Sequence, residues 1–197
     1  DAPLSYYSKD LEALDLNFEN KSPDDCPSIS FLSLDIDEVP DKYEEYLESY
    51  FTTFDINKNN FFADISNYIS YEMGQPTHCY DRSSIEGDIE FISDDFNEKF
   101  ETLLGKEITL SGKNCVFKSN NKVINLAGVM GGNSTACNEN TKNVLIECAY
   151  FKPETIIGKA LKYNLHSDAS HKFERGVNPS SQEQTLRRFI KIVSDHT

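Results

Sequence analysis

The stretch EITLSGKNCVFKSNNKVINLA, residues 107–127, alternates short runs of β-branched and aromatic residues with Gly, Asn and Ser. Such runs favour β-strands, and the small polar residues between them favour turns. The pattern continues on both sides of this stretch, so that the expected strands are residues 89–93, 107–110, 116–117, 123–127 and 144–148. The middle of the chain is therefore predicted to form a β core.

On the amino-terminal side of this core, residues 28–36 alternate apolar and polar side chains, as a half-buried strand does. The aromatic spacing after Pro40 predicts a helix that ends before Asp55. A second helix is expected over residues 61–73, with Gly74 as a left-handed cap.

On the carboxy-terminal side, one helix is expected to start at Pro153 and another near Ser180, where Ser180 and Glu183 have the spacing of a capping box. Strands grouped between helices, without a βαβ repeat, predict an α+β fold with a mixed or antiparallel, sandwich-like β core flanked by helices. Residues 1–25 are acidic and lack a sustained period, which predicts a loosely attached linker or arm. Residues 26–197 are expected to form one compact unit.

The formal net charge of −14 argues against a protein that grips a phosphate backbone by charge alone. Lys and Arg are concentrated in residues 152–191, where a polyanion would approach, although these side chains could equally be the solvated faces of helices. The five Cys have no close pair, which favours a reducing cytoplasm over a disulfide framework. No run is long and apolar enough for a membrane helix, and the start at Asp1 suggests a piece of a longer protein.

Metal sites find little support in the sequence. A calcium-loop pattern begins at Asp55, but Asn60 stands where glycine is needed and Ser66 stands where glutamate is needed. His166 and His171 have no thiolate pair near them in the sequence, which argues against zinc. We therefore expect no metal.

Three features could serve chemistry, and each has an ordinary structural explanation. The glycine-rich corner LAGVMGG, from Leu126, could let a ligand approach the backbone or could simply make a tight turn. Glu147 lies in an apolar strand, where a carboxylate is costly unless it is paired, used or turned outward. His78 follows a Gly-Gln-Pro corner and could be a ligand-binding or a structural histidine.

Taken together, four strings resemble the beta chain of bacterial-type phenylalanyl-tRNA synthetase. The resemblance runs from about Cys26 to the end of the chain and corresponds to the tandem B3/B4 editing region of that family. The strings are SNYISYEMGQPTHCYD from Ser66, LAGVMGG from Leu126, NVLIECAYFKP from Asn143 and HSDASHKFERGVNP from His166.

The resemblance implies a module that hydrolyses tyrosine wrongly attached to tRNA(Phe). By motif, His78, Asn67 and Ser167 would hold the water and the ester in line, and Glu147 would accept a hydrogen bond from the tyrosine hydroxyl. The remaining implied pocket residues, which bind or leave room for the substrate, are Gly128, Ala127, Ala169 and Ser66. Ser66 and Ser167 stand where the family usually has Thr, so the hydroxyl is kept and the methyl is lost.

Editing would need no cofactor, whereas ATP and Mg belong to the parent enzyme and would bind outside this region. The implied partners are the acceptor end of tRNA(Phe), the alpha chain and the rest of the beta chain, in an alpha2-beta2 enzyme of the cytoplasm. The alternatives are a non-catalytic module that holds tRNA or braces its neighbours, which the acidic charge favours, and a free-standing editing factor.

Overall fold

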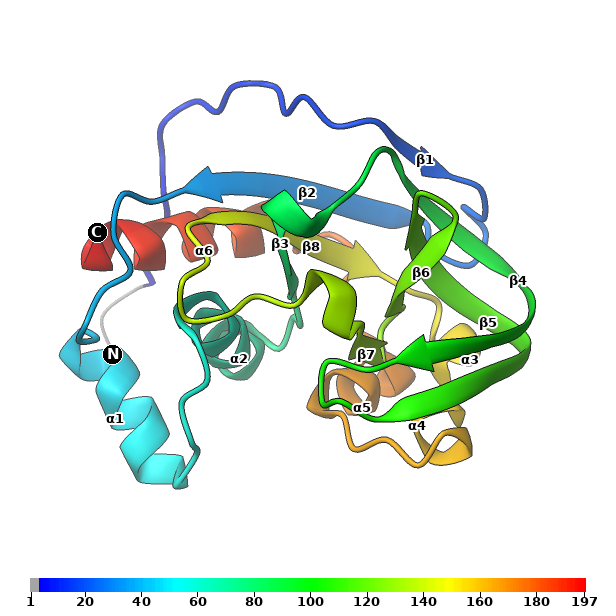
Figure 1. Ribbon diagram of the computed structural model, residues 1–197. Coiled ribbons are helices and arrows are strands. Elements are labelled where there is room, and N and C mark those ends of the chain that lie inside the picture. The colour runs from blue at the N-terminus through cyan, green and yellow to red at the C-terminus, as the bar shows by residue number, and fades with distance from the viewer. Residues whose placement is uncertain (1–3) are drawn as a thin grey trace.

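The computed structural model describes residues 4–197, which form two β-sheets flanked by helices (Figure 1). The smaller sheet is antiparallel, with strand order β2-β8-β3, and consists of β2 (Ser28–Asp35), β8 (Asn143–Tyr150) and β3 (His78–Asp81). The larger sheet has the order β1-β4-β5-β6-β7, with β1 (Phe18–Asn20), β4 (Ile89–Glu101), β5 (Glu107–Ser119), β6 (Lys122–Leu126) and β7 (Met130–Gly131). Among the strands of residues 4–197, only β1 pairs in parallel, with β4, so the predicted α+β fold with a mixed sheet is confirmed.

Six α-helices and two short 3-10 helices complete the described part of the chain. They are α1 (Glu45–Phe54), α2 (Phe61–Met73), η1 (Arg82–Ser84), η2 (Asn133–Thr135), α3 (Pro153–Ile156), α4 (Lys159–Lys162), α5 (Asp168–Arg175) and α6 (Gln182–His196). The predicted helix at residues 61–73 is confirmed at both ends. The Asn60 side chain accepts a hydrogen bond from the backbone of Ala63, and Gly74 adopts the left-handed cap with φ 70°.

Several predicted boundaries need correction. The runs at residues 107–110 and 116–117 are one strand, because β5 pairs with β4 along its whole length. The helix expected at Pro153 is interrupted at Gly158, whose φ of 76° no helix contains. The capping box is wrong: the cap of α6 is Ser181, which makes no side-chain cap bond, and the backbone N–H of Ser180 donates to Asn178 Oδ1.

The two faces of β8 belong to two different apolar cores. Val144, Ile146 and Cys148 pack with the helical side, which includes residues of α1, α2 and α6. Leu145 and Ala149 point the other way, toward the larger sheet. Because strand side chains alternate, Glu147 must share the face of Leu145 and Ala149, between the sheets.

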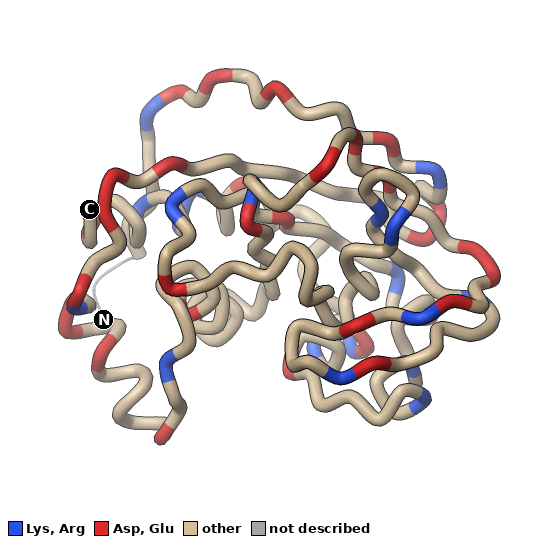
Figure 2. The backbone as a smooth tube through the Cα atoms, viewed as in Figure 1, with Lys and Arg blue, Asp and Glu red and all other residues tan. Residues whose placement is uncertain are grey.

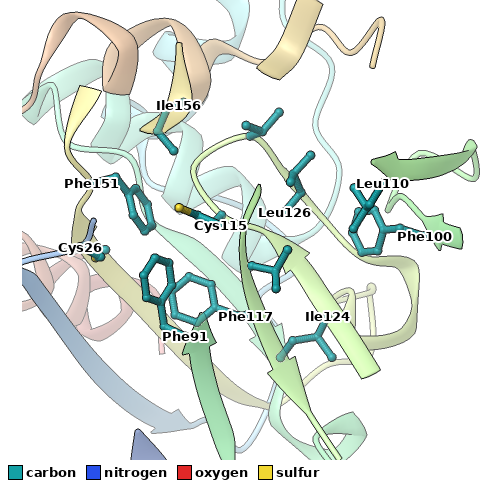
Figure 3. Close-up of a cluster of buried hydrophobic side chains, with 14 of the residues drawn as sticks. Cys26, Phe91, Phe100, Leu110, Cys115, Phe117, Ile124, Leu126, Phe151 and Ile156 are labelled. Atoms are coloured by element: carbon teal, nitrogen blue, oxygen red, sulfur yellow. The ribbon is translucent and has the colours of Figure 1, made fainter. Parts of the chain in front are cut away.

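Aromatic rings fill the core between the sheets (Figure 3). The ring centroid of Phe91 lies 5.2 Å from that of Phe117 and 5.9 Å from that of Phe151. All three side chains are fully buried, and burial of one such side chain contributes about 1.5–3 kcal/mol. The same core includes Leu145 and Ala149 of β8, so this packing supports the strand that carries Glu147.

The amino-terminal segment is held more closely than its composition predicts. Figure 1 shows it running past β2 toward β1, which pairs with β4, and Leu14, Leu16 and Phe18 pack against the core between the sheets. The Arg187 guanidinium donates to the carbonyl oxygens of Tyr7 and Lys9 at 3.1 and 3.0 Å. Residues 1–3 of the expected arm lie outside the described residues.

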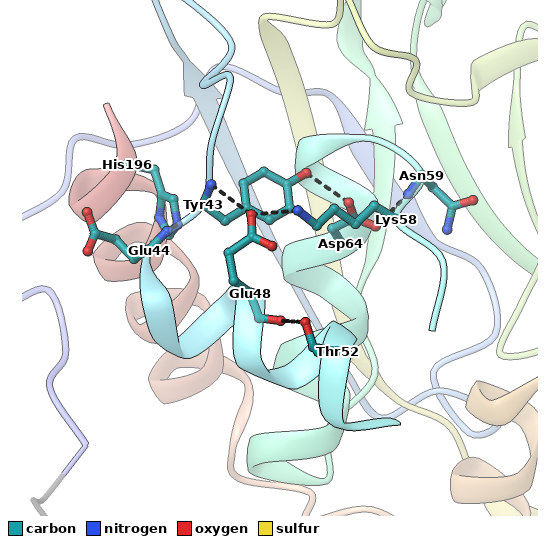
Figure 4. Close-up of polar contacts among 8 residues, drawn as sticks. All are labelled: Tyr43, Glu44, Glu48, Thr52, Lys58, Asn59, Asp64 and His196. Atoms are coloured by element: carbon teal, nitrogen blue, oxygen red, sulfur yellow. Dashed lines mark hydrogen bonds and ion pairs between the residues drawn. The ribbon is translucent and has the colours of Figure 1, made fainter. Parts of the chain in front are cut away.

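A polar network joins α1, α2 and the loop between them (Figure 4). The Tyr43 hydroxyl donates to Asp64 Oδ2 at 2.8 Å, and the Asn59 backbone N–H donates to Asp64 Oδ1 at 2.9 Å. The Lys58 ammonium pairs with Glu48 at 2.5 Å. Within the segment that resembled a calcium loop, Asn59 and the buried Asp64 are thus joined by a protein hydrogen bond.

No helix within residues 4–197 combines the length and the apolar character that a membrane crossing requires.

Candidate functional site

A cleft of about 470 Å³ lies where α2, β3, β8, the β6–β7 corner and the start of α5 meet. Its volume falls within the range of small-ligand sites. Seven of the eight residues predicted for the site line it, namely Ser66, Asn67, His78, Gly128, Glu147, Ser167 and Ala169. A larger groove elsewhere is walled by acidic side chains, including Glu19, Glu86 and Asp88, and none of the predicted site residues lies in it.

Ala127 was also predicted for the site, but it does not line the cleft. It ends β6 with its side chain in the core between the sheets, and only 1% of its surface is exposed. Its backbone N–H donates to the carbonyl of Cys115 at 3.0 Å. The chain turns toward the cleft one residue later, at Gly128.

Glu147 lies on the face of β8 that looks toward the larger sheet, and it is 4% exposed. Its Oε2 accepts from the Tyr80 hydroxyl at 3.2 Å and from Asn125 Nδ2 at 3.3 Å. No Lys, Arg or His pairs with it in the described part of the chain. Burial therefore dominates and raises the pKa of this carboxyl to about 8.

His78 opens β3 and is the direct cross-strand partner of Glu147. Its Nε2 is buried and has no hydrogen-bond partner among residues 4–197, although the residue lines the cleft. Burial lowers the pKa of His78 to about 4, so that the imidazole is neutral at neutral pH. A buried ring nitrogen without a partner is costly unless a ligand or a water completes it.

Two glycines of the LAGVMGG corner have different reasons to lack a side chain. A Cβ on Gly131 would lie 2.2 Å from Cε1 of His78, so that only glycine lets the imidazole occupy its position. A Cβ on Gly128 would lie 2.9 Å from Ile156 Cδ1 and 3.1 Å from Phe151 Cδ2, and φ there is +69°. Gly128 is thus required by the turn and the core, and Gly131 by the cleft.

The serine hydroxyls hold the walls of the cleft. Ser66 Oγ donates to the Thr77 carbonyl oxygen at 2.7 Å, which ties α2 to the corner before His78. Ser167 is the N-cap of α5, and its Oγ accepts from the Ser170 backbone N–H at 3.1 Å. Asn67 is exposed at the rim, and Ala169 lies half-buried in the first turn of α5.

Sequence reasoning missed Tyr80, Asn125 and Gly131. Tyr80 lies two residues after His78, and strand alternation would have placed both on one face. Asn125 gave a weaker signal, as an amide inside the apolar run of β6. Helix α5 was also missed, although Ser167 and Ser170 at its start are typical of a helix N-terminus.

The described residues contain no group of three or more His, Cys, Asp or Glu side chains arranged to hold a metal ion. The polar groups that line the cleft include a buried carboxyl, a neutral imidazole, amides and hydroxyls. Such groups can bind a polar substrate through hydrogen bonds and orient a water molecule beside it.

Comparison with known proteins gives a consistent result. Residues 38–197 match the B3/4 domain family. The chain is 39% identical over 133 residues to the phenylalanine–tRNA ligase beta subunit of Dickeya dadantii, a match that covers 68% of this chain and 17% of the relative. The beta subunit of Methylococcus capsulatus is 42% identical over 131 residues, which cover 66% of this chain and 17% of the relative. The chain thus spans about a sixth of the length of these relatives.

A similar fold occurs in a solved structure of an amino-terminal fragment of the phenylalanyl-tRNA synthetase beta subunit from Pyrococcus horikoshii. The TM-score is 0.59 at 11% sequence identity, and the match covers 96% of this chain and 51% of that one. At this identity the likeness concerns the fold alone.

Proposed function

The chain belongs to the B3/4 domain family, and from that premise we propose that it is the editing module of a phenylalanine–tRNA ligase beta subunit. In this role it hydrolyses the ester bond between tyrosine and tRNA(Phe) and leaves phenylalanyl-tRNA(Phe) intact. The proposal concerns the cleft, and the synthetic reaction belongs to other parts of the ligase.

The observation that carries this proposal is the buried Glu147 carboxyl in the wall of the cleft, with hydrogen bonds to only one of its two oxygens among residues 4–197. A bound tyrosine can donate its hydroxyl hydrogen to the other oxygen. Phenylalanine would leave that oxygen without a partner, and a site that hydrogen-bonds a substrate hydroxyl can reject the analogue lacking it by ~10⁴–10⁵. Such a difference protects the correct product.

Hydrolysis in this proposal proceeds by positioning of a water. His78 and Asn67 orient the water beside the ester carbonyl, its oxygen bonds to the carbonyl carbon, and the ester C–O bond breaks. One water proton goes to the departing ribose oxygen and the other leaves with the tyrosine acid group, so that the products are tyrosine and uncharged tRNA. Because the pKa of His78 is lowered to about 4, its imidazole is a weak base, which favours positioning over general-base catalysis.

The other lining residues have supporting roles. The Ser167 hydroxyl accepts the cap bond of α5 and keeps its own hydrogen free for the ester. Ala169 leaves room for the substrate ring, and Gly128 brings the backbone to the bound amino acid. Ser66 holds the corner from which His78 projects.

The partners that follow from this role are the acceptor end of tRNA(Phe), an alpha subunit and the rest of the beta subunit, in a cytoplasmic enzyme. ATP and Mg would serve the synthetic reaction outside residues 1–197, and editing needs neither. These assignments rest on the names of relatives of which this chain spans about a sixth.

The net charge favours a second candidate function, that of a non-catalytic module which braces neighbouring domains or holds tRNA. Figure 2 marks Asp and Glu positions along the amino-terminal segment, α1 and the larger sheet. At −14 overall, the chain would bind RNA weakly by charge alone. In this case the cleft has no catalytic role and the module does not release tyrosine from tRNA.

The test is deacylation by the assembled ligase of tRNA(Phe) charged with tyrosine or with phenylalanine, comparing wild type with Glu147→Ala and His78→Ala. We expect His78→Ala to slow tyrosine release by roughly a hundredfold, the scale of one lost catalytic group. Glu147→Ala should weaken the preference for tyrosine. Normal release in both variants would refute the residue roles, and no release by wild type would favour the bracing module.

A further inference from the structure

We propose that Tyr80 and Asn125 are positioning residues that hold one oxygen of Glu147 and thereby present the other oxygen to a phenolic hydroxyl. The inference rests on the proposed function for its substrate, but its geometric part stands on the hydrogen bonds of the cleft wall. Neither residue needs to touch the substrate ester, since both act through Glu147.

The three side chains form a closed triangle of hydrogen bonds. Asn125 Nδ2 donates to the Tyr80 hydroxyl oxygen at 2.8 Å and to Glu147 Oε2 at 3.3 Å, and the Tyr80 hydroxyl donates to the same Oε2 at 3.2 Å. The residues come from β6, β3 and β8, so that the triangle joins both sheets. A carboxyl held by two donors on one oxygen cannot rotate without breaking both bonds.

The second oxygen, Oε1, accepts no hydrogen bond from any of residues 4–197. Glu147 lines the cleft, as does the neighbouring His78, whose buried Nε2 also lacks a partner among the described residues. The wall therefore offers one open acceptor beside one unpartnered imidazole nitrogen.

The surroundings make the two donors important for the charge of Glu147. The titratable side chains around it are His78, Cys79 and Tyr80 of β3, Cys26 before β2 and Cys148 of β8, and none of them is cationic at neutral pH. Burial raises the pKa of the carboxyl, and the hydrogen bond from Tyr80 opposes that rise. The donors thus keep part of the carboxyl population ionised, and an ionised oxygen is the stronger acceptor for a phenol.

The two hydrogen bonds to Oε2 also affect the discrimination between tyrosine and phenylalanine. Phenylalanine leaves only Oε1 without a partner, so that the discrimination depends on a single hydrogen bond and on the direction of Oε1. Loss of either donor should weaken binding of the phenol more than it slows the chemistry, because the ester lies at the other end of the substrate.

The chain offers a matched control. Tyr163 and Asn114 form a second buried tyrosine–asparagine pair, in which the Tyr163 hydroxyl donates to Asn114 Oδ1 at 2.9 Å. Neither residue lines the cleft. Tyr163→Phe and Asn114→Leu therefore remove the same groups from the same kind of pair without touching Glu147.

The experiment compares Tyr80→Phe and Asn125→Leu with this control pair in two measurements. The first is deacylation of tyrosyl-tRNA(Phe) by the assembled ligase, where we expect KM to rise roughly tenfold with a smaller change in kcat, the scale of one hydrogen bond to a charged group. The second is titration of the Glu147 carboxyl in this chain by ¹³C NMR, assigned with Glu147→Gln. We expect its midpoint to rise above about 8 in Tyr80→Phe.

Unchanged KM and an unchanged midpoint in both cleft variants would overturn the proposal, as would equal shifts in the control pair. If wild-type ligase releases no tyrosine, the proposed function fails, and the carboxyl titration still decides whether the two residues position Glu147. Tyr80→Phe preserves the ring, so that one variant remains informative if Asn125→Leu does not fold.

Discussion

Two buried carboxylates of this chain each accept a hydrogen bond from a tyrosine hydroxyl, Asp64 from Tyr43 and Glu147 from Tyr80. Asp64 lies in the network between α1 and α2, and both of its oxygens have protein donors, the second being the Asn59 backbone N–H (Figure 4). Glu147 lies in the cleft wall, and both of its donors share Oε2. Burial raises the pKa of both carboxyls, so that burial alone does not distinguish them.

The difference lies in the number of oxygens that the protein satisfies. A carboxylate with donors on both oxygens fastens a loop and has no capacity left for a ligand. A carboxylate with one open oxygen beside a cleft costs stability until a ligand donates to it. We therefore assign structure to Asp64 and recognition to Glu147, and the predictions below test that division.

The largest effect is expected from truncation of Glu147. Glu147→Ala should lower the preference of the ligase for tyrosyl-tRNA(Phe) over phenylalanyl-tRNA(Phe) by roughly a hundredfold, since a buried acceptor that phenylalanine leaves unpaired costs about 1–3 kcal/mol. Stability should fall less than in Asp64→Ala: the Tyr80 hydroxyl loses its acceptor, but a buried carboxyl with one unsatisfied oxygen is removed at the same time. Competitive deacylation of the two substrates measures the preference, and a large loss of stability without a change of preference would reverse the assignment.

The same truncation at Asp64 should act on stability instead. Asp64→Ala leaves the Tyr43 hydroxyl and the Asn59 N–H without their acceptor, at a cost of about 3 kcal/mol in the free energy of unfolding. Urea denaturation of the chain measures this cost. The ratio of tyrosine to phenylalanine release should stay at the wild-type value in the folded variant, and a changed ratio would show that the two carboxylates are not separable.

The pH dependence of stability should carry the signature of Glu147. Its pKa is about 8 in the folded chain against an ordinary value of 4.5, so the native state retains a proton that the unfolded state has lost. This contribution to stability is therefore fully present below about pH 4.5 and declines until about pH 8, with a slope of up to about 1.4 kcal/mol per pH unit. His78, with its lowered pKa, gives an opposite slope between about pH 4 and 6.5.

The interval from pH 6.5 to 8 consequently isolates Glu147. Wild type should lose stability relative to Glu147→Gln across this interval in urea denaturation. Parallel curves for the two proteins would mean that the carboxyl is not held in a raised-pKa environment.

A smaller effect is expected at the glycine that His78 packs against. In Gly131→Ala the new Cβ would overlap the imidazole of His78 and displace it. Tyrosine release should therefore slow by roughly tenfold. Gly128→Ala should instead destabilise the chain by about 1–3 kcal/mol, because its Cβ meets core side chains. Comparing release rates with unfolding curves separates the two, and identical behaviour of both variants would mean that the two glycines are not required for different reasons.

The sequence predicted the helices and strands that are determined by residues close together in the chain. The 3.6-residue period after Asn60 and the cap at Gly74 predict both ends of α2. The alternation of residues 28–36 predicted β2 to within one residue at its end. The boundaries that failed depend on pairing, since β5 is continuous only because β4 binds it along its length.

The candidate site shows the same division. Seven of the eight residues predicted for the site line the cleft. They could be predicted because they belong to the four sequence strings that resemble the synthetase beta chain. Tyr80 and Asn125 escaped notice because their meaning arises from contacts with Glu147 across 67 and 22 positions of sequence. Ala127 lies beside the cleft and not in its lining, because a one-residue step along a strand end changes the side on which a side chain lies.

The most direct test of the division between the two carboxylates is a crystal structure of the chain with a non-hydrolysable tyrosyl-adenosine analogue, in which an amide replaces the ester. We predict that the phenol oxygen lies about 2.5–2.8 Å from Glu147 Oε1, with Oε2 still bonded to Tyr80 and Asn125 and with Asp64 unchanged. A ligand bound in the cleft with its phenol away from Glu147, or one that displaces Tyr80 from Oε2, would contradict the account.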